Sequence, residues 1–256
     1  MKSLVIVGGA GRMGQTLAEG LGALEGFAVV ALVDVATPRE LFGAVYAATL
    51  EGVDASTVDV VVDFSAPESV VLSASWCAVH GVALVIGTTG LSLEQRQAVV
   101  VAATKVGVVM ASNFSLGAVL SEKFAALAAP YFDSVEIIEL HHDRKVDAPS
   151  GTSLAAARAI EHARSSAQMT PIVDPTVRHT VAGARGAETT GGIRIHSIRL
   201  PGLVAHQQIL FGARGEGLSI RHDSFDRVSF VRGVAVAANA IDESPRFIDG
   251  LGPLID

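Results

Sequence analysis

The sequence predicts an α/β protein with two parts: a parallel sheet covered by helices, and a smaller α+β domain with a mixed sheet. Half of the 256 residues are apolar and only 5% are aromatic, so we expect a core of Ala, Val, Leu and Ile, as in parallel sheets. Short β-branched runs alternate with helical patterns as far as residue 112. Beyond it, three strand-like runs follow one another without helices between them.

The first part shows a regular strand–helix succession. The expected strands are 3–8, 28–34, 58–64, 82–89 and 106–112, and the expected helices are 12–24, 68–81 and 91–106. Ser92 followed by Gln95 forms a capping-box pattern, which predicts the start of the third helix. Such a succession predicts parallel strands, whose carboxyl ends lie at one edge of the sheet.

The pattern changes at Asn113. A helix is expected there, with an apolar stripe formed by Leu116, Val119, Leu120, Phe124 and Leu127. The expected strands are 134–142, 192–200, 204–212 and 217–222, and the expected helices are 153–167 and 227–242, the last returning to the first domain. We therefore assign 1–112 with 221–256 to a dinucleotide-binding domain, and 113–220 to a substrate-binding and oligomerisation domain.

Charge and hydropathy exclude several classes of partner. A formal net charge of −7, without clustered Lys and Arg, argues against nucleic-acid binding. The most apolar stretches are shorter than the roughly 20 residues that a membrane span requires, and the N-terminus has no secretory signal pattern. The single cysteine, Cys77, lies in an apolar helical stretch and is expected in the core. We expect a soluble cytoplasmic protein.

A glycine-rich run directly follows the first expected strand. Gly8 precedes the pattern G-x-G-x-x-G, formed by Gly9, Ala10, Gly11, Arg12, Met13 and Gly14, and this pattern opens a helix. Glycines here permit a tight turn and let the backbone approach a pyrophosphate, which is bound at the helix N-terminus. In this context the run predicts a Rossmann-type domain that binds NADH or NADPH. The alternative is a glycine-rich turn without a ligand.

Asp34 ends the second expected strand, 20 residues after Gly14. A carboxylate at this place accepts hydrogen bonds from the adenosine ribose hydroxyls and repels a 2′-phosphate. NADH is therefore favoured as the cofactor. NADPH stays possible because Arg12 and Arg39 could supply positive charge to a phosphate.

Two further strand ends are candidates for the nicotinamide ribose and ring, because ligands of such sheets bind at the carboxyl edge. They are Gly87, Thr88 and Thr89 in one loop, and Ala111, Ser112, Asn113 and Phe114 in the other. Ordinary β-to-α turns are the alternative interpretation.

The densest polar stretch is 139–152, between a strand and a helix. His141, His142 and Lys145 offer donors and positive charge, while Ser150, Gly151 and Thr152 begin the next helix and offer hydroxyls and N–H groups. These features predict a site for a carboxylate. The alternative is a solvated basic loop with a capped helix.

No metal is expected at this stretch. The chain has no H-E-x-x-H pattern and no cysteine cluster, and neighbouring histidines rarely bind one ion. His179, His196 and His206 are isolated, and single histidines are more often structural than catalytic.

Five motifs together resemble the dihydrodipicolinate reductase family, also named 4-hydroxy-tetrahydrodipicolinate reductase. They are the glycine run, VDFSAP at 62–67, GTTG at 87–90, SNFSLG at 112–117 and, most specifically, HHDRKVDAPSGT at 141–152. The resemblance implies reduction of 4-hydroxy-tetrahydrodipicolinate (dihydrodipicolinate), a cyclic dicarboxylate, to tetrahydrodipicolinate with NADH or NADPH, in diaminopimelate and lysine biosynthesis. It also implies a homotetramer built by the central domain.

By the same resemblance, His141 is the acid/base residue and Lys145 stabilises the charged intermediate. His142, Lys145, Ser150, Gly151 and Thr152 contact the substrate. One departure is Ala205, which precedes His206 where the family often has a Glu-His pair. The competing hypotheses are another Rossmann reductase, such as an amino-acid or sugar dehydrogenase, and a dinucleotide sensor without turnover.

Overall fold

The computed structural model describes residues 1–255, and these form two compact units. One unit comprises Met1–Leu116 and the residues from Arg227 onward, and the other comprises Gly117–Asp226. The border that we expected between residues 220 and 221 falls inside the strand β11 (Glu216–Ser224). Arg221 and Asp223 continue the pairing of this strand with its neighbour, so the second unit extends beyond the expected border.

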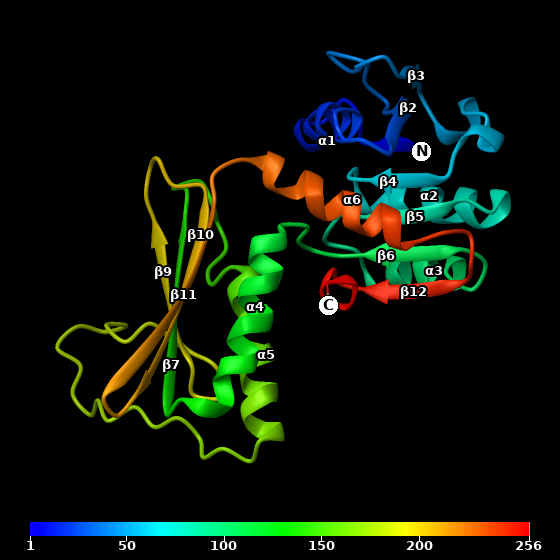
Figure 1. Ribbon diagram of the computed structural model, residues 1–256. Coiled ribbons are helices and arrows are strands. Elements are labelled where there is room, and N and C mark those ends of the chain that lie inside the picture. Colours follow the sequence, from blue (N-terminus) through cyan, green and yellow to red (C-terminus); the bar gives the residue numbers. More distant parts are fainter. Residues whose placement is uncertain (256) are drawn as a thin grey trace. The chain divides into compact units, whose positions relative to one another are not determined.

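The first unit is built on a parallel sheet with the strand order β12-β6-β5-β4-β1-β2-β3 (Figure 1). The strands are β1 (Lys2–Val7), β2 (Phe27–Val33), β3 (Val45–Ala47), β4 (Val60–Asp63), β5 (Ala83–Ile86), β6 (Gly107–Met110) and β12 (Arg246–Asp249). The strands β4, β5 and β6 are buried at every position, as expected for a sheet covered on both faces. The short strands β3 and β12 were not expected.

Four helices cover this sheet, two on each face: α1 (Arg12–Gly22), α2 (Pro67–His80), α3 (Leu93–Ala102) and α6 (Val231–Ala240). The predicted capping box is present, with reciprocal hydrogen bonds between Ser92 and Gln95. The helix α6 contacts α1, β4 and β5, so the C-terminal segment completes this unit as expected. Cys77 is fully buried in the core.

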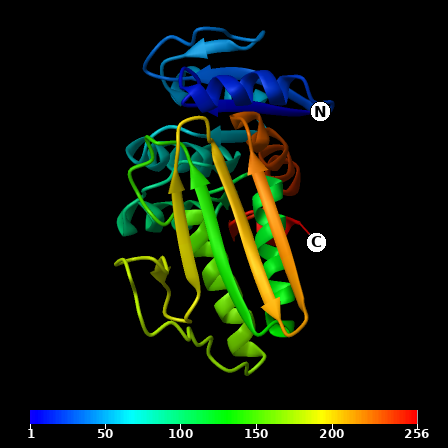
Figure 2. The same ribbon diagram turned by 90° about the vertical axis from the view of Figure 1, so that its left-hand side faces the viewer.

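The second unit is built on a mixed sheet with the order β11-β10-β7-β9-β8. Its strands are β7 (Ser134–His141), β8 (Ala187–Glu188), β9 (Arg194–Arg199), β10 (Ala205–Ala213) and β11. Only β7 and β9 pair in parallel. The helices α4 (Leu116–Ala128) and α5 (Gly151–Ser166) lie behind the sheet in Figure 2, and its front face carries no helix. Both units match the predicted fold class.

The expected helix is present as α4, but its apolar stripe is not its buried face. Phe124 is 54% exposed and Leu127 is 71% exposed, whereas Ala118, Ser121 and Ala125 are buried. Ala125 belongs to the apolar core of this unit. No helix in the described chain is long and apolar enough to cross a membrane.

Candidate active site

The glycine run forms a turn between β1 and α1. Gly8 has a φ of +85°, and a Cβ there would lie 2.5 Å from the carbonyl oxygen of Phe64. A Cβ on Gly14 would lie 2.1 Å from the carbonyl oxygen of Gly8, so both positions require glycine for packing. At Gly11 the nearest atom is 3.2 Å away. No side chain caps the N-terminus of α1, so its first N–H groups are suited to a phosphate.

Asp34 follows β2 and holds the glycine turn. Its Oδ2 accepts a hydrogen bond from the N–H of Ala10 at 2.9 Å, and its Oδ1 accepts one from Ala36 at 3.1 Å. The next residue, Val35, is 95% exposed and brings no charge. Arg12 and Arg39 are exposed. The carboxylate therefore lies beside the turn, where the ribose of a bound dinucleotide is expected.

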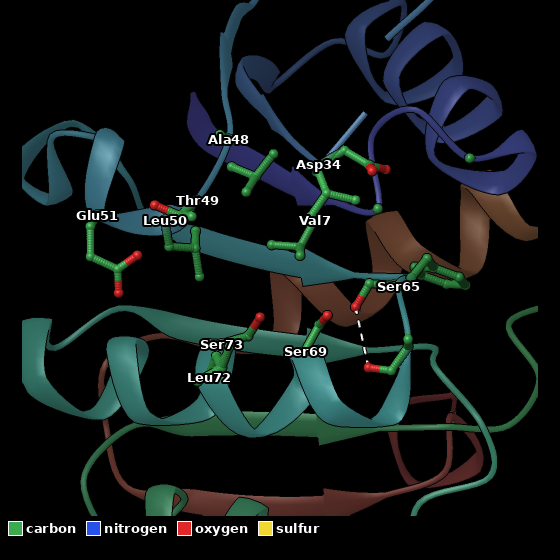
Figure 3. Close-up of a pocket in the computed structure, with 16 residues that line it drawn as sticks. Val7, Asp34, Ala48, Thr49, Leu50, Glu51, Ser65, Ser69, Leu72 and Ser73 are labelled. Atoms are coloured by element: carbon green, nitrogen blue, oxygen red, sulfur yellow. Dashed lines mark hydrogen bonds between the residues drawn. The ribbon is translucent and has the colours of Figure 1, made fainter. Parts of the chain in front are cut away.

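Asp34 borders a cavity of about 400 Å³ in the first unit (Figure 3). The other lining residues are Val7, Gly8, Gly11, Val33, Val35, Ala48, Thr49, Leu50, Glu51, Phe64, Ser65, Ala66, Ser69, Leu72 and Ser73. The motif VDFSAP contains three of them, Phe64 to Ala66. We did not predict Ala48–Glu51 or the α2 residues Ser69, Leu72 and Ser73, because no local pattern in the sequence marks them.

A buried carboxylate supports one wall of this cavity. Asp63 is fully buried, and its Oδ1 accepts hydrogen bonds from the Ser65 hydroxyl at 2.6 Å and the Thr88 hydroxyl at 2.9 Å. Its Oδ2 accepts one from the Ser73 hydroxyl at 2.6 Å. The Thr88 hydroxyl also accepts a hydrogen bond from the N–H of Ser65. Asp63 therefore joins the loops after β4 and β5 to α2.

The predicted nicotinamide-binding loops come together at a second cavity, of about 270 Å³. Its lining includes Thr88, Thr89, Ala111 and Ser112, together with Gly90, Leu91, Arg96, Met110, Asp249 and Gly250. The Arg96–Asp249 ion pair, at 2.7 Å, was not predicted.

Three other predicted cofactor residues have structural contacts. Phe114 is fully buried, and its ring lies 5.5 Å from that of Phe64. A Cβ on Gly87 would overlap the Phe64 ring, at 2.1 Å. Asn113 accepts a hydrogen bond from the N–H of Ser115. Contact between these residues and a cofactor stays a prediction.

In the second unit, one face of the sheet changes from apolar to polar along its strands. The helix-covered face carries the paired row Ile137, Ile195 and Ile209, all buried. The next row along the strands contains Glu139, Ser197 and Gln207, and the last contains His141, Arg199 and Ala205. We call these two rows the polar end of the sheet. The predicted acid/base residue therefore lies on a strand face.

Glu139 organises the polar end. Its fully buried carboxylate accepts two hydrogen bonds from Arg199, each 2.8 Å long, and lies 2.5 Å from Nδ1 of His141. Burial raises the pKa of Glu139, but hydrogen bonds from Arg199, Ser197 and His141 lower it more, so the carboxylate is ionised.

The pKa of His141 is lowered from 6.5. Burial is the largest cause, and the cations of Lys145 and Arg199 act in the same direction, against the opposite effect of Glu139. The ring is therefore neutral at pH 7, with the Nδ1 proton directed to Glu139.

Lys145 lies in the segment between β7 and α5. Its Nζ is 2.8 Å from both carboxylate oxygens of Asp147, which is 59% exposed. The main-chain oxygen of Asp147 accepts a hydrogen bond from Arg199 at 2.7 Å. This hydrogen bond joins the segment to the polar end. The ammonium group of Lys145 already contacts one carboxylate, that of Asp147.

The N-terminus of α5 lies against the polar end. Ser150 caps the helix by accepting a hydrogen bond from the N–H of Ser153. The Ser153 hydroxyl donates to Oε1 of Gln207 at 2.6 Å and lies 2.9 Å from the hydroxyl of Ser150. Ser150 is thus buried and its hydroxyl caps the helix, while Gly151, the first helical residue, is exposed.

His142 and His206 have different environments. Nδ1 of His142 is buried without a hydrogen-bond partner in residues 1–255, as expected of a group that binds a ligand. Both ring nitrogens of His206 are hydrogen-bonded. Nε2 accepts from the N–H of Val204, and Nδ1 is bonded to the carboxylate of Asp223. Ala205 stands where the family often has a glutamate before His206. In this chain the carboxylate beside His141 is that of Glu139, on the same strand.

The geometry describes two kinds of binding surface. The first unit offers a glycine turn, a helix without a side-chain cap and the carboxylate of Asp34 beside the turn, which fit a dinucleotide. The second unit offers His141, His142, Lys145 and a helix N-terminus, which fit an anion. Among the described residues, no group of three or more His, Cys, Asp or Glu side chains could hold a metal ion.

Comparisons with known proteins identify relatives over the whole chain. The family models described as "Dihydrodipicolinate reductase, N-terminus" and "Dihydrodipicolinate reductase, C-terminus" match residues 2–114 and 117–251. The 4-hydroxy-tetrahydrodipicolinate reductase of Streptococcus suis is 42% identical over 255 residues, covering 98% of each chain. That of Cutibacterium acnes is 41% identical over 258 residues, covering 100% of this chain and 99% of its own.

Solved structures agree. A dipicolinate-bound dihydrodipicolinate reductase from Paenisporosarcina sp. TG-14 is 39% identical, covers 100% of both chains and has a TM-score of 0.88. A myo-inositol dehydrogenase from Corynebacterium glutamicum has a TM-score of 0.59 at 14% identity, covering 94% of this chain and 88% of its own, and shares the fold alone. The motif-based resemblance is confirmed, and the chain belongs to the dihydrodipicolinate reductase family.

Proposed function

We propose that this protein reduces 4-hydroxy-tetrahydrodipicolinate to tetrahydrodipicolinate with NADH or NADPH, a step of diaminopimelate and lysine biosynthesis. The observation that carries the proposal is the polar end of the second sheet. It brings His141, Lys145 and the N-terminus of α5 together in a unit whose core is otherwise apolar, and this supports an acid/base role for His141. Two relatives named 4-hydroxy-tetrahydrodipicolinate reductase, matched over 98% and 99% of their own chains, support the choice of substrate.

The substrate is a ring with two carboxylates, and the polar end has groups suited to them. Lys145 offers an ammonium group, Gly151 begins a helix whose N-terminus attracts anions, and His142 has an unpaired ring nitrogen. When a substrate carboxylate approaches Lys145, it competes with Asp147 for the ammonium group. The solved relative with bound dipicolinate supports a cyclic dicarboxylate as the ligand.

The 4-hydroxyl group of the substrate leaves as water, which gives the unsaturated ring of dihydrodipicolinate. Reduction of that ring then needs one hydride and one proton. When bound, NADH or NADPH would supply the hydride. Lys145 stabilises the negative charge that the ring gains, and His141 delivers the proton from Nε2. His141 is neutral without ligand, but two substrate carboxylates nearby would raise its pKa and favour the protonated ring.

NADH is the favoured cofactor. The carboxylate of Asp34 lies beside the glycine turn, and a 2′-phosphate at the adenosine ribose would be repelled by it. NADPH remains a second substrate in this proposal, because Arg12 and Arg39 are exposed and could approach a phosphate.

We further propose a homotetramer assembled through the second unit. One face of the sheet has no helix over it (Figure 2). This face carries the half-buried apolar residues Ile138, Leu140, Ile198 and Leu210. Uncovered apolar faces of this kind are typical of subunit interfaces. Sedimentation in solution tests the assembly, since a single species near the chain mass of 26.4 kDa would contradict it.

The activity is tested by following NADH oxidation with the freshly made condensation product of aspartate semialdehyde and pyruvate. The native protein should turn over rapidly, and Lys145→Ala should lose about 10³-fold or more in kcat while still binding NADH. Lys105→Ala removes an exposed lysine from the first unit and is the matched control. Cofactor binding without turnover by the native protein would favour a dinucleotide sensor instead.

A further inference from the structure

We propose that Glu139 is a positioning residue for His141, and that Arg199 holds Glu139 and the Lys145 segment in one arrangement. The inference rests on the proposed function, because it concerns how the acid/base group of that reaction is held. Sequence reasoning had not singled out Glu139 or Arg199. The carboxylate does not need to touch the substrate for this role, because it acts through the histidine ring.

Glu139 carries a buried negative charge. Glu139 is fully buried, and a buried carboxylate without partners is strongly destabilising. Arg199 compensates it with two parallel hydrogen bonds from Nη1 and Nη2. This bidentate geometry fixes the plane of the carboxylate, so its oxygens have one defined direction.

Glu139 also determines which ring nitrogen of His141 carries the proton. Glu139 and His141 are two residues apart on β7, so their side chains lie on the same face of the sheet. The carboxylate can only accept, so Nδ1 must donate, and the neutral ring has its proton on Nδ1. Nε2 then carries the lone pair and is the nitrogen that takes up and delivers the reaction's proton.

Arg199 also links the histidine to the lysine. Nη2 of Arg199 also donates to the main-chain oxygen of Asp147, whose carboxylate contacts Lys145. The guanidinium group of Arg199 therefore contacts both Glu139, which holds His141, and the segment that carries Lys145. Arg199 lies 60 residues after Glu139 in the sequence, and the parallel pairing of β7 and β9 brings them together.

The same sheet offers a matched control group. Glu136 lies on β7 with its side chain on the opposite face, where it pairs with Arg185 and lies 2.7 Å from Nε2 of His196. It reproduces the glutamate–arginine–histidine combination away from the polar end. A general loss of charge pairing in the sheet would affect both groups alike, whereas positioning of the acid/base group concerns Glu139 alone.

The experiment compares Glu139→Gln with Glu136→Gln in steady-state kinetics. We expect Glu139→Gln to lower kcat about 10²–10⁴-fold, as in other sites where the tautomer of a catalytic histidine is lost, with less than about a tenfold change in KM. Glu136→Gln should stay within about threefold of the native kcat. Equal losses in the two variants would overturn the proposal, as would a native-like kcat in Glu139→Gln.

Nitrogen-15 NMR of the histidine rings gives a readout that does not require activity. In the ligand-free native protein, His141 should have its proton on Nδ1, and Glu139→Gln should shift the population toward the Nε2 tautomer. If Glu139→Gln does not fold, the native spectrum decides: a proton on Nε2 overturns the proposal. A native protein with the expected tautomer but no reductase activity would contradict the proposed function and leave the positioning of the ring intact.

Discussion

The two sheets of this protein build their binding surfaces in different ways. In the parallel sheet, β4, β5 and β6 are buried at every position, so no strand face is left for a ligand. Polar groups that face its cavities lie where strands end, among them the main-chain N–H groups of the glycine turn, Asp34 and Thr88. In the mixed sheet, β7 alternates between buried and half-buried positions, and its buried face ends in Glu139 and His141.

The difference shows how burial decides where chemistry is possible. A sheet covered on both faces can offer only its edge loops, which favours binding through the backbone. A sheet whose covered face extends past its apolar core can present side chains directly from a strand, which holds them more rigidly than a loop. We therefore expect substitutions to affect the two surfaces differently.

The largest effect is expected where the backbone itself is packed. Gly14→Ala places a methyl group 2.1 Å from the Gly8 carbonyl oxygen, so the glycine turn must shift. We expect a loss of about 3 kcal/mol or more in the free energy of unfolding of the first unit. Fluorescence of Trp76, the sole tryptophan, follows this unit.

Gly11→Ala is the control for this change, because its nearest contact is 3.2 Å away. It should unfold within about 1 kcal/mol of the native protein but bind NADH at least about tenfold more weakly. Equal stability losses in both variants would show that the turn is not packed as described.

A smaller effect is expected on stability when adjacent residues of one strand are compared in each sheet. Leu84 and Val85 on β5 are both fully buried, whereas Ile209 on β10 is fully buried and Leu210 is half-buried. Leu84→Ala and Ile209→Ala should each cost about 2–4 kcal/mol, and Val85→Ala about 1–3 kcal/mol. Leu210→Ala should cost less than about 1 kcal/mol in the dissociated chain. Urea unfolding measures these values, and a cost for Leu210→Ala equal to that for Ile209→Ala would refute the one-sided burial of β10.

A third effect concerns the carboxylate at the edge of the parallel sheet. Asp34→Ala removes the charge that would repel a 2′-phosphate, so the preference for NADH over NADPH should fall about tenfold. The ratio of kcat/KM values for the two cofactors measures this change. An unchanged ratio would mean that Asp34 does not determine cofactor choice.

The smallest expected effect is a difference in acid sensitivity. Partners in the second unit lower the pKa of Glu136, Glu139, Asp147, Asp174 and Asp223, and burial lowers that of His141 and His222. The unfolded chain then binds more protons than the folded one, so this stability is present above the unfolded pKa values and is lost as the pH falls.

Glu122, whose pKa burial raises, acts in the opposite sense. In the first unit, hydrogen bonds lower the pKa of Asp54 and Asp242, which are both exposed. Hydrogen exchange at decreasing pH should therefore show the second unit opening first, by about half a pH unit. Earlier opening of the first unit would contradict this prediction.

The sequence was sufficient for the parts of the protein that depend on local patterns. The alternation of strands and helices, the capping box at Ser92 and the glycine turn are each set within a few residues, and the structure contains all of them. The apolar stripe on α4 is not the buried face of the helix, because apolar character does not by itself decide burial. Ala118 and Ala125 are buried, whereas Phe124 is exposed.

By itself, the sequence determined the two-part α/β architecture, the dinucleotide turn, the family and the segment carrying His141 and Lys145. Only the tertiary structure decided which groups support them. Strand pairing brings Arg199 to Glu139, helix docking brings Ser153 to Gln207, and the segment after β3 contributes to the cavity wall beside Asp34. The physical reason is that hydrogen bonds and burial depend on distance in space, and residues 50 or 60 positions apart carry no local pattern that indicates their contact.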